Sequence, residues 1–342
     1  MRYIFIILLI VSIANNAYSQ NNGKLYNQII NRSELLIIDH RYQEALKEYE
    51  QVFNDTGIAF TRDIYNALVC SAKLGDYKRV KKFSAQLAEK GVGAMFFSRN
   101  VFKNYYNRKD FKKIVNMAAK VHERFKNNNL LYNDTLNEFV GLDQAYNRIR
   151  LTRYADSFDL PDTLEVLFWH NTQNLLRFIK NNGFYTENKV GAYVHDTILG
   201  RSYSADIVFL HYLEMGHDKD LINQIKDLYL NKLYDCEIPP GHTEQIIQLA
   251  NNVFGDTGDY AYKIYQCGLY KMKGLPEPQN ISANREKYLL DNIDDYGKKL
   301  AFVYSEPGEF AFTPRIIGGS YIDEAFLKES YNFIAKIEGC AQ

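Results

Sequence analysis

The side chains of this chain that are best suited to chemistry are one histidine and one amide. His211 lies within the apolar segment Ala205–Met215, and Asn171 falls on the apolar face of the helix predicted after Pro161. A histidine can act as a general acid or base near neutral pH, and a nearby amide can orient a substrate. Together with His170, the neighbour of Asn171, these residues are candidates for the active site of a hydrolase in the cell envelope.

A metal site is an alternative for the same segment, because His211, Glu214 and His217 follow one another at intervals of three residues. Imidazole and carboxylate groups are common metal ligands. Gly216, however, is expected to end the helix before His217, and no second Glu-x-x-His sequence completes a dinuclear centre. We therefore expect no bound metal and no cofactor, and His211 then serves as a core histidine with a hydrogen-bonded ring.

Common catalytic signatures are missing from the sequence: there is no GxSxG, Walker loop or HExxH, and no GxGxxG after a strand. Asn171 also has a structural explanation, because burying an unpaired amide costs about 1–3 kcal/mol. A buried Asn171 that holds the Gly183 loop or the His211 helix in place accounts for the same pattern. The 27 tyrosines and 21 phenylalanines leave glycan binding as a further alternative.

The stretch Pro161–Gly191 is predicted to form the helix that positions Asn171. Asp162 can cap its first turn while Glu165 reaches back, and Gly183 can supply the left-handed residue that ends it. At about 100° per residue, the apolar side chains fall on one stripe. Those side chains are Leu164, Leu167, Phe168, Leu175, Phe178 and Ile179. Asn171 lies near the middle of the stripe, so we expect the amide to be buried.

Residues 1–19 have the features of a secretory signal peptide. A basic second residue is followed by the short apolar core Tyr3–Ile13 and by the small-residue segment Ala17–Ser19. The apolar core is too short to span a bilayer. We therefore expect cleavage between Ser19 and Gln20 and export to the periplasm or the medium, with no integral membrane segment after cleavage.

Composition limits the classes of partner. The chain has 41 Lys and Arg residues and 41 Asp and Glu residues. Loss of the signal peptide with its one arginine leaves a net charge of about −1, which favours neither nucleic acid nor an anionic membrane. Hydrophobic residues make up 46% of the 342 positions, enough for the packed cores of two domains.

The four cysteines are too few for a disulfide scaffold, and their spacing does not match a zinc site. Cys70 falls at a small-residue position of a predicted helix and is expected to be a buried thiol. If a bridge forms in the exported protein, Cys236 with Cys267 is the favoured pair, because both lie in the second half of the chain.

Between about residues 20 and 155 the chain repeats itself. The same position opens a helix three times, at intervals of 35 and 34 residues, in the dipeptides Arg41-Tyr42, Asp76-Tyr77 and Asp110-Phe111. The segment before each dipeptide is expected to be a helix too. A fourth, more degenerate helical pair is predicted from Tyr132 to Tyr154.

The repeated segment resembles the tetratricopeptide repeat family. Ala72–Val80 resembles the turn between the two helices of one repeat, and Tyr42–Phe53 resembles the second helix. The resemblance implies stacked helix pairs with a concave groove that holds a peptide or a partner protein. The alternative is that the repeats only support the second domain.

From Leu164 to Tyr296 the chain resembles an uncharacterised bacterial family of helical domains. The matching residues are Asn171, Leu175, Phe178, Ile179, Gly183, Phe184, Tyr185, Val190, Gly191, His211, Ile238 and Pro239. Two departures remove candidate acids: Phe168 stands in place of an acidic residue, and Gln248–Ala250 stands in place of an Asp-Arg pair. If the family is catalytic, these departures imply that this member has lost the activity.

The remaining helices and strands are predicted from the periodicity of apolar residues and from the glycines and prolines that interrupt it. A loop or short hairpin is predicted after Gly191, and Leu300–Tyr304 with Phe310–Phe312 predicts a small β-hairpin. The predicted helices are Ala205–Met215, Asp220–Leu233, Thr243–Phe254, Tyr260–Met272, Asn284–Tyr296 and Tyr321–Ile337.

The sequence as a whole predicts an all-α protein. A tetratricopeptide-like α-α solenoid occupies residues 20–155, and a mainly helical domain with a small β-hairpin occupies residues 161–342. The predicted function is that of an exported module for peptide or protein interaction, or a scaffold, with the partner in the repeat groove. The alternatives are an envelope hydrolase with a pocket joining His211 and Asn171, and a glycan-binding protein.

Overall fold

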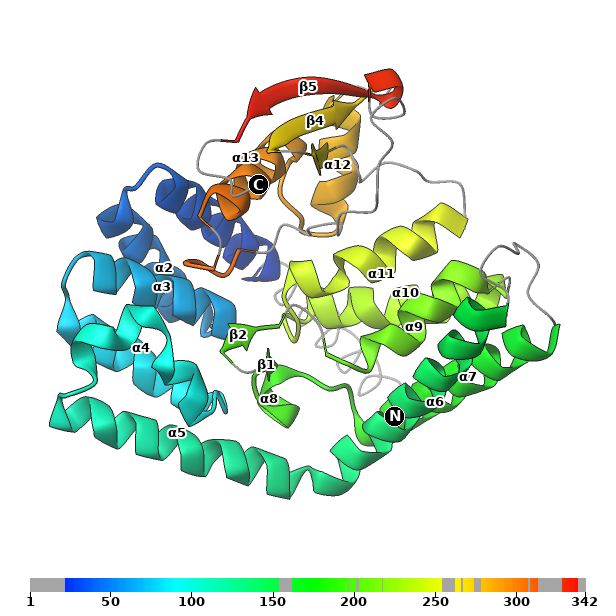
Figure 1. Cartoon of the computed structure of the whole chain (residues 1–342), viewed down its shortest axis with the longest axis horizontal. Coiled ribbons are helices and arrows are strands. Elements are labelled where there is room, and N and C mark those ends of the chain that lie inside the picture. Colours follow the sequence, from blue (N-terminus) through cyan, green and yellow to red (C-terminus); the bar gives the residue numbers. More distant parts are fainter. Residues whose placement is uncertain are drawn as a thin grey trace, which may run out of the picture. The chain divides into compact units, whose positions relative to one another are not determined.

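The computed structural model describes residues 22–153, 162–195, 197–200, 203–216, 218–253, 262–265, 267–273, 278–306, 308–312 and 328–337. Most of these residues are helical, and the N-terminal helices pack as consecutive pairs (Figure 1). Short antiparallel strands occur among the later helices. The predicted fold class, consecutive helix pairs followed by a mainly helical segment with a small hairpin, is confirmed.

The first half of the described chain is a series of helices: residues 22–38, α2 (Tyr42–Thr56), α3 (Thr61–Lys73), α4 (Tyr77–Glu89), α5 (Lys109–Asn128) and α6 (Leu130–Arg153). The repeat dipeptides open helices as predicted, because α2 begins at Tyr42, α4 begins at Tyr77, and Asp110 is the second residue of α5. The helix over 22–38 and α3 precede the first two of these helices.

The turn between α3 and α4 has a local cause. Gly75 has φ of 68°, in the left-handed region that favours glycine after a helix. Asp76 then caps α4, because its Oδ1 accepts a hydrogen bond from the backbone N–H of Arg79 at 3.1 Å. The glycine-aspartate pair therefore ends one helix and starts the next.

The segment predicted to be the third repeat departs from the predicted pair of α-helices. The 3-10 helices η1 (Ala94–Ser98) and η2 (Asn100–Tyr105) take the place of its first helix. Gly91, with φ of 87°, ends the preceding turn, and the chain then folds around buried phenylalanine rings. Phe97 and Phe102 contact each other and Phe111 of α5, with ring centroids 5.2 to 6.1 Å apart. Aromatic packing has replaced a regular helix here.

The region predicted as a fourth helical pair, Tyr132 to Tyr154, is instead covered by the single helix α6. Gly141, near its middle, does not interrupt the helix, which is continuous on both sides of it. Tyr154 lies outside the described residues. α6 is therefore a long helix that can contact several partners.

The second half of the described chain contains α7 (Asp162–Asn182), α8 (Glu187–Val190), β1 (Val194–His195), β2 (Ile198–Leu199), α9 (Asp206–Met215), α10 (Lys219–Tyr234), α11 (Pro240–Val253), β3 (Tyr262–Tyr265), β4 (Gly268–Met272), α12 (Pro278–Lys287), α13 (Ile293–Ser305) and β5 (Tyr331–Lys336). α7, α9, α10 and α11 match predicted helices. Gly183 follows α7 with φ of 82°, as expected, and β1–β2 is the short hairpin predicted after Gly191.

The helix predicted over Tyr260–Met272 is wrong in its described part. β3 and β4 form an antiparallel hairpin there, with Tyr262 paired to Lys271 and Tyr265 paired to Gly268. β-branched and aromatic residues favour strands, and β5 supplies a third strand on the other side of β4. The described end of the predicted helix Tyr321–Ile337 is this strand β5, so that prediction is also wrong over residues 331–336.

The hairpin predicted over Leu300–Tyr304 and Phe310–Phe312 is wrong as well, because Leu300–Tyr304 lies inside α13. Asn292 starts that helix, since its Oδ1 accepts from the backbone N–H groups of Asp294 and Asp295. This strong cap also explains why the helix predicted over Asn284–Tyr296 divides into α12 and α13.

Chain contacts divide the protein into two compact units. Unit 1 contains the described residues of Met1–Gln86, Leu233–Gly241 and Gly258–Gln342; unit 2 contains those of Leu87–Lys232 and His242–Thr257. Within unit 1, Asn66 of α3 accepts from the backbone N–H of Ala311 at 2.7 Å. The domain boundary expected near residues 155–161 stays a prediction.

Among the described residues, no helix combines the length and apolar character needed to cross a membrane. Cys70 is a buried thiol, as predicted. The predicted pairing of Cys236 with Cys267 is wrong, because Cys236 is a thiol and Cys267 is disulfide-bonded. The partner of Cys267 lies outside the described residues. Cys236 instead points its thiol toward the backbone oxygen of Tyr234, at 3.8 Å.

Candidate functional site

Asn171 and His211 both attach their helices to α6 in unit 2. The Asn171 amide nitrogen, on α7, donates to the backbone oxygen of Phe139 at 2.9 Å. His211 Nδ1, on α9, lies 2.7 Å from Oδ2 of Asp143. Phe139 and Asp143 are one helical turn apart, so the two predicted site residues meet neighbouring turns of the same helix.

Both side chains are buried, with exposed fractions of 4% for Asn171 and 8% for His211. A buried amide and a buried imidazole need partners, and each finds one on α6. Two oxygens of the cluster, Oδ1 of Asn171 and Oδ1 of Asp143, are buried and have no hydrogen-bond partner within the described residues. The two contacts connect α7 and α9 to α6, and the two unpaired oxygens can each accept a further hydrogen bond.

His170 points away from this cluster. Its side chain is exposed, and its ring contacts Trp169 edge to face at a centroid distance of 4.9 Å. Trp169 in turn donates its indole N–H to Oδ2 of Asp218 at 3.0 Å. His170 therefore belongs to the surface of α7 rather than to the Asn171 and His211 cluster.

Of the residues considered for a metal, the two that are described have separate partners, and His211 pairs with Asp143. Glu214 is exposed and forms an ion pair with Arg150 at 3.7 Å, and His217 lies outside the described residues. In the described part of the chain, no three His, Cys, Asp or Glu side chains converge in a way that could hold a metal ion.

A second histidine and aspartate pair, not predicted from the sequence, lies in the core of unit 2. His242 Nε2 of α11 is 2.7 Å from Oδ2 of Asp206, the first residue of α9. The contact has the distance of an ion pair without the alignment of a hydrogen bond, since both atoms are unsatisfied among the described residues. Tyr185 donates to the other carboxylate oxygen at 2.7 Å, and Tyr229 donates to the same atom.

The tyrosines of this cluster are donors, not bases. Burial, and then the neighbouring Asp206 carboxylate, raise the pKa of Tyr185 and of Tyr229 well above the ordinary phenol value. Both phenols therefore stay protonated near neutral pH and hydrogen-bond the buried carboxylate. Because all of these side chains are buried, the cluster acts as a polar core that fixes α9 against its neighbours.

No motif marks this second cluster in the sequence. Asp206 precedes an apolar run, and His242 follows two prolines with ordinary spacing. The one available signal is an acidic residue at the start of an otherwise apolar helix, which needs a buried partner. The partner itself could not be named without the fold.

An open surface depression of about 560 Å³ lies on α5. Its lining residues all come from this one helix and are all exposed: Ala119, Lys120, Glu123, Arg124, Asn127 and Asn128. They follow one another at alternating intervals of one and three residues, so they form a single broad face of the helix.

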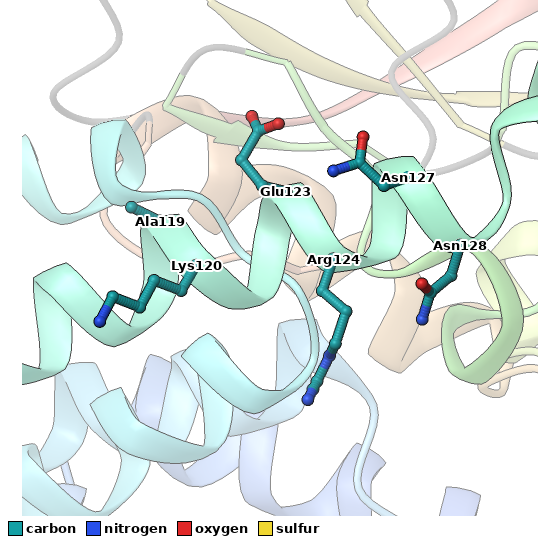
Figure 2. A pocket seen from close by; sticks show the side chains of 6 residues that line it. All are labelled: Ala119, Lys120, Glu123, Arg124, Asn127 and Asn128. Carbon is teal, nitrogen blue, oxygen red and sulfur yellow. The ribbon is translucent and has the colours of Figure 1, made fainter.

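The side chains of this α5 face divide into two rows. Figure 2 shows Lys120, Arg124 and Asn128 extending from one side of α5, and Glu123 and Asn127 from the other. Within the described residues, Lys120 and Arg124 form no ion pair, and both are exposed. The first row therefore presents two unneutralised cations and an amide, one helical turn apart.

Comparisons with protein-family models, with curated proteins and with solved structures find no match to this chain. The functional argument therefore depends on the geometry of the described residues.

Proposed function

We propose that this protein is an exported interaction module that binds an extended, acidic segment of a partner on the exposed face of α5. The observation that carries the proposal is the row of Lys120, Arg124 and Asn128, whose side chains are exposed and whose two cations form no ion pair within the described residues. α5 is the helix opened by the third repeat dipeptide, and the resemblance to tetratricopeptide repeats supports a peptide or protein as the partner.

The spacing of the two cations suits an extended chain. Side chains one helical turn apart are about 5–6 Å from each other, and alternate side chains of an extended peptide are about 6.5 Å apart. Lys120 and Arg124 can therefore each meet one of two acidic side chains on the same side of a peptide. Asn128, in the same row, carries an amide that both donates and accepts hydrogen bonds, which suits a peptide backbone.

The expected affinity contribution is modest. Exposed ion pairs contribute about 0.2–1 kcal/mol each, so two pairs change affinity by about 2- to 30-fold. They are also screened by salt, with a Debye length of about 8 Å at physiological ionic strength. Binding through this face is thus expected to weaken as salt is added.

Selection of binders from a random peptide display library on the purified protein tests the proposal. The expected result is enrichment of peptides with acidic residues at alternate positions. The double variant Lys120→Ala/Arg124→Ala should lose this enrichment, and Lys112→Ala/Lys113→Ala, which removes two exposed charges elsewhere on α5, should retain it. Equal enrichment on both variants would refute the role of the α5 face.

Export is part of the same proposal and has its own test. The apolar Tyr3–Ile13 core and the small residues before Gln20 support cleavage between Ser19 and Gln20. Expression of the full chain in a bacterial host, followed by mass spectrometry of the periplasm and medium, should find a protein that begins at Gln20. Recovery of the uncleaved chain from the cytoplasm alone would contradict export.

The hydrolase alternative receives less support. Its candidates His211 and Asn171 are buried and occupied by internal hydrogen bonds to α6, as a core role requires. The tyrosines at Tyr185 and Tyr229 are buried rather than displayed, so they do not support a glycan platform.

A further inference from the structure

α6 carries a stripe of exposed and half-buried residues on a face where it packs against no other described helix. Its buried residues are Leu136 and Asp143, on the face that meets α7 and α9. On another face lie residues spaced alternately four and three apart: Leu131, Thr135, Glu138, Leu142, Ala145 and Ile149. Leu131 is 81% exposed, Leu142 47% and Ile149 38%.

This spacing is that of a coiled-coil seam. Residues that alternate three and four apart form the narrow stripe through which one helix packs on another. The stripe runs from Leu131 to Ile149, about 27 Å along the helix. Large apolar side chains at both ends and near the middle gain free energy when they are removed from water. The seam therefore fits a second helix.

The order of the residues favours a second copy of α6 running in the opposite direction. The intervals read the same forwards and backwards, so an antiparallel copy places Leu131 against Ile149, Thr135 against Ala145 and Glu138 against Leu142. Each pair occurs twice about a two-fold axis, which is how an isologous dimer interface is built. A parallel copy would instead place the two Glu138 carboxylates against each other.

Charge complementarity supports the antiparallel arrangement. Asp134 and Arg148 lie on the same edge of the seam, one residue before Thr135 and Ile149. In the antiparallel pair, Asp134 of each copy faces Arg148 of the other. Neither side chain has an ion-pair partner within the described residues of its own chain.

Gly141 lies on this edge midway between those two charges, at the position of the two-fold axis. Its α-carbon faces open space, since a Cβ placed there would meet nothing within 4 Å. A glycine inside a helix costs about 0.5–1 kcal/mol relative to alanine. No described residue packs against this position, and a glycine there would let the backbone of a second helix approach closely.

We propose that the protein forms a two-fold symmetric dimer through antiparallel pairing of α6 with α6 of a second copy. The contact uses Leu131, Leu142 and Ile149 as apolar anchors and two Asp134–Arg148 ion pairs. One helix pair buries less area than an obligate interface, so the dimer is weak and reversible. The dimer face is separate from the α5 face, so either can fail without the other.

Sedimentation velocity of the purified protein, from low micromolar to several hundred micromolar concentration, is the test. The wild-type sedimentation coefficient should rise with concentration toward that of a dimer. Leu142→Glu should stay monomeric throughout. Glu138→Leu, which replaces the charged seam residue, should shift the monomer–dimer midpoint to lower concentration. Leu151→Glu changes another exposed leucine of α6, which lies away from the seam, and should match wild type.

Charge reversal gives the decisive comparison. Asp134→Arg alone and Arg148→Asp alone place like charges in both pairs and should weaken the dimer, whereas the double variant restores opposite charges and should recover it. Far-ultraviolet circular dichroism confirms that each variant is folded. A monomer at all concentrations for wild type and for Glu138→Leu, or no recovery in the double variant, overturns the proposal. The Lys120→Ala/Arg124→Ala variant should dimerise normally.

Discussion

Replacement of Lys299 is the most severe test of how unit 1 is held together. The Lys299 ammonium, on α13, is only 1% exposed, donates to Glu34 of the N-terminal helix, and reaches Oδ2 of Asp291 at 2.7 Å. Lys299→Met fills the same space with an apolar side chain but leaves the Glu34 carboxylate buried without its nearest cation. The variant therefore isolates the cost of an unpaired buried charge.

The magnitude follows from burial and from the remaining partner. Removing one partner of a buried ion pair costs about 3–5 kcal/mol. Arg62 still lies 3.7 Å from the other Glu34 oxygen, so the lower end, about 3 kcal/mol, applies. For a folding unit of about 150–250 residues, a loss of about 3 kcal/mol in the free energy of unfolding corresponds to a fall in melting temperature of about 6–12 °C. The double variant Lys299→Met/Glu34→Leu removes both charges and should recover most of the loss.

The pH dependence provides a second readout. Burial raises the pKa of Glu34, and the charges of Lys299 and Arg62 oppose that rise. Without Lys299 the pKa of Glu34 rises further, so protonation favours the folded state. The deficit of Lys299→Met should therefore be largest near neutral pH and shrink as the pH falls. Urea unfolding at several pH values measures both effects. A loss below 1 kcal/mol, or a double variant no better than the single one, would refute the reasoning.

Three further predictions concern unit 2 and the turns. The hydrogen bond from the Trp169 indole, and then those from backbone N–H groups, lower the pKa of Asp218. The ionised carboxylate therefore contributes stability at pH values above the ordinary aspartate pKa, and this contribution is lost as the pH falls through the lowered pKa. Fluorescence of the single tryptophan should change with a midpoint below about 3.9, and Asp218→Asn should abolish that transition. His211→Leu leaves the buried Asp143 carboxylate without its imidazole partner, with Gln144 still donating to it at 3.2 Å, and should lower the free energy of unfolding by about 1–3 kcal/mol. A loss near zero in thermal unfolding would contradict a stabilising role for the pair. Gly91→Ala should lower the melting temperature more than Gly57→Ala does. Both glycines have positive φ, but a Cβ at Gly91 would lie 2.8 Å from a phenylalanine ring, whereas one at Gly57 would meet nothing within 4 Å. Equal melting temperatures for the two variants would contradict this.

The parts of the fold that the sequence predicts well have local causes. α7 and its burial of Asn171 follow from apolar periodicity, a capping residue and Gly183. The turn at Gly75 and Asp76 follows from one glycine and one cap. In each case the residues that decide the structure lie within a few positions of one another.

The parts that fail depend on distant residues. β3 and β4 are stabilised by β5, about 60 residues further along the chain, and helical periodicity in a short window cannot report that pairing. The pairing of Asp206 with His242 joins two helices in the same way. The α5 face could not be predicted either, because its charges are ordinary in composition. Only the fold shows that Lys120 and Arg124 are exposed and form no ion pair in the described part of the chain.

A titration of one peptide from the display selection against three proteins tests the central claim most directly. Fluorescence anisotropy at two salt concentrations should give a Kd for Lys120→Ala/Arg124→Ala about 2- to 30-fold weaker than wild type, with a reduced dependence on salt. Lys112→Ala/Lys113→Ala should bind like wild type. Equal affinity and equal salt dependence for all three proteins would contradict binding at the α5 face.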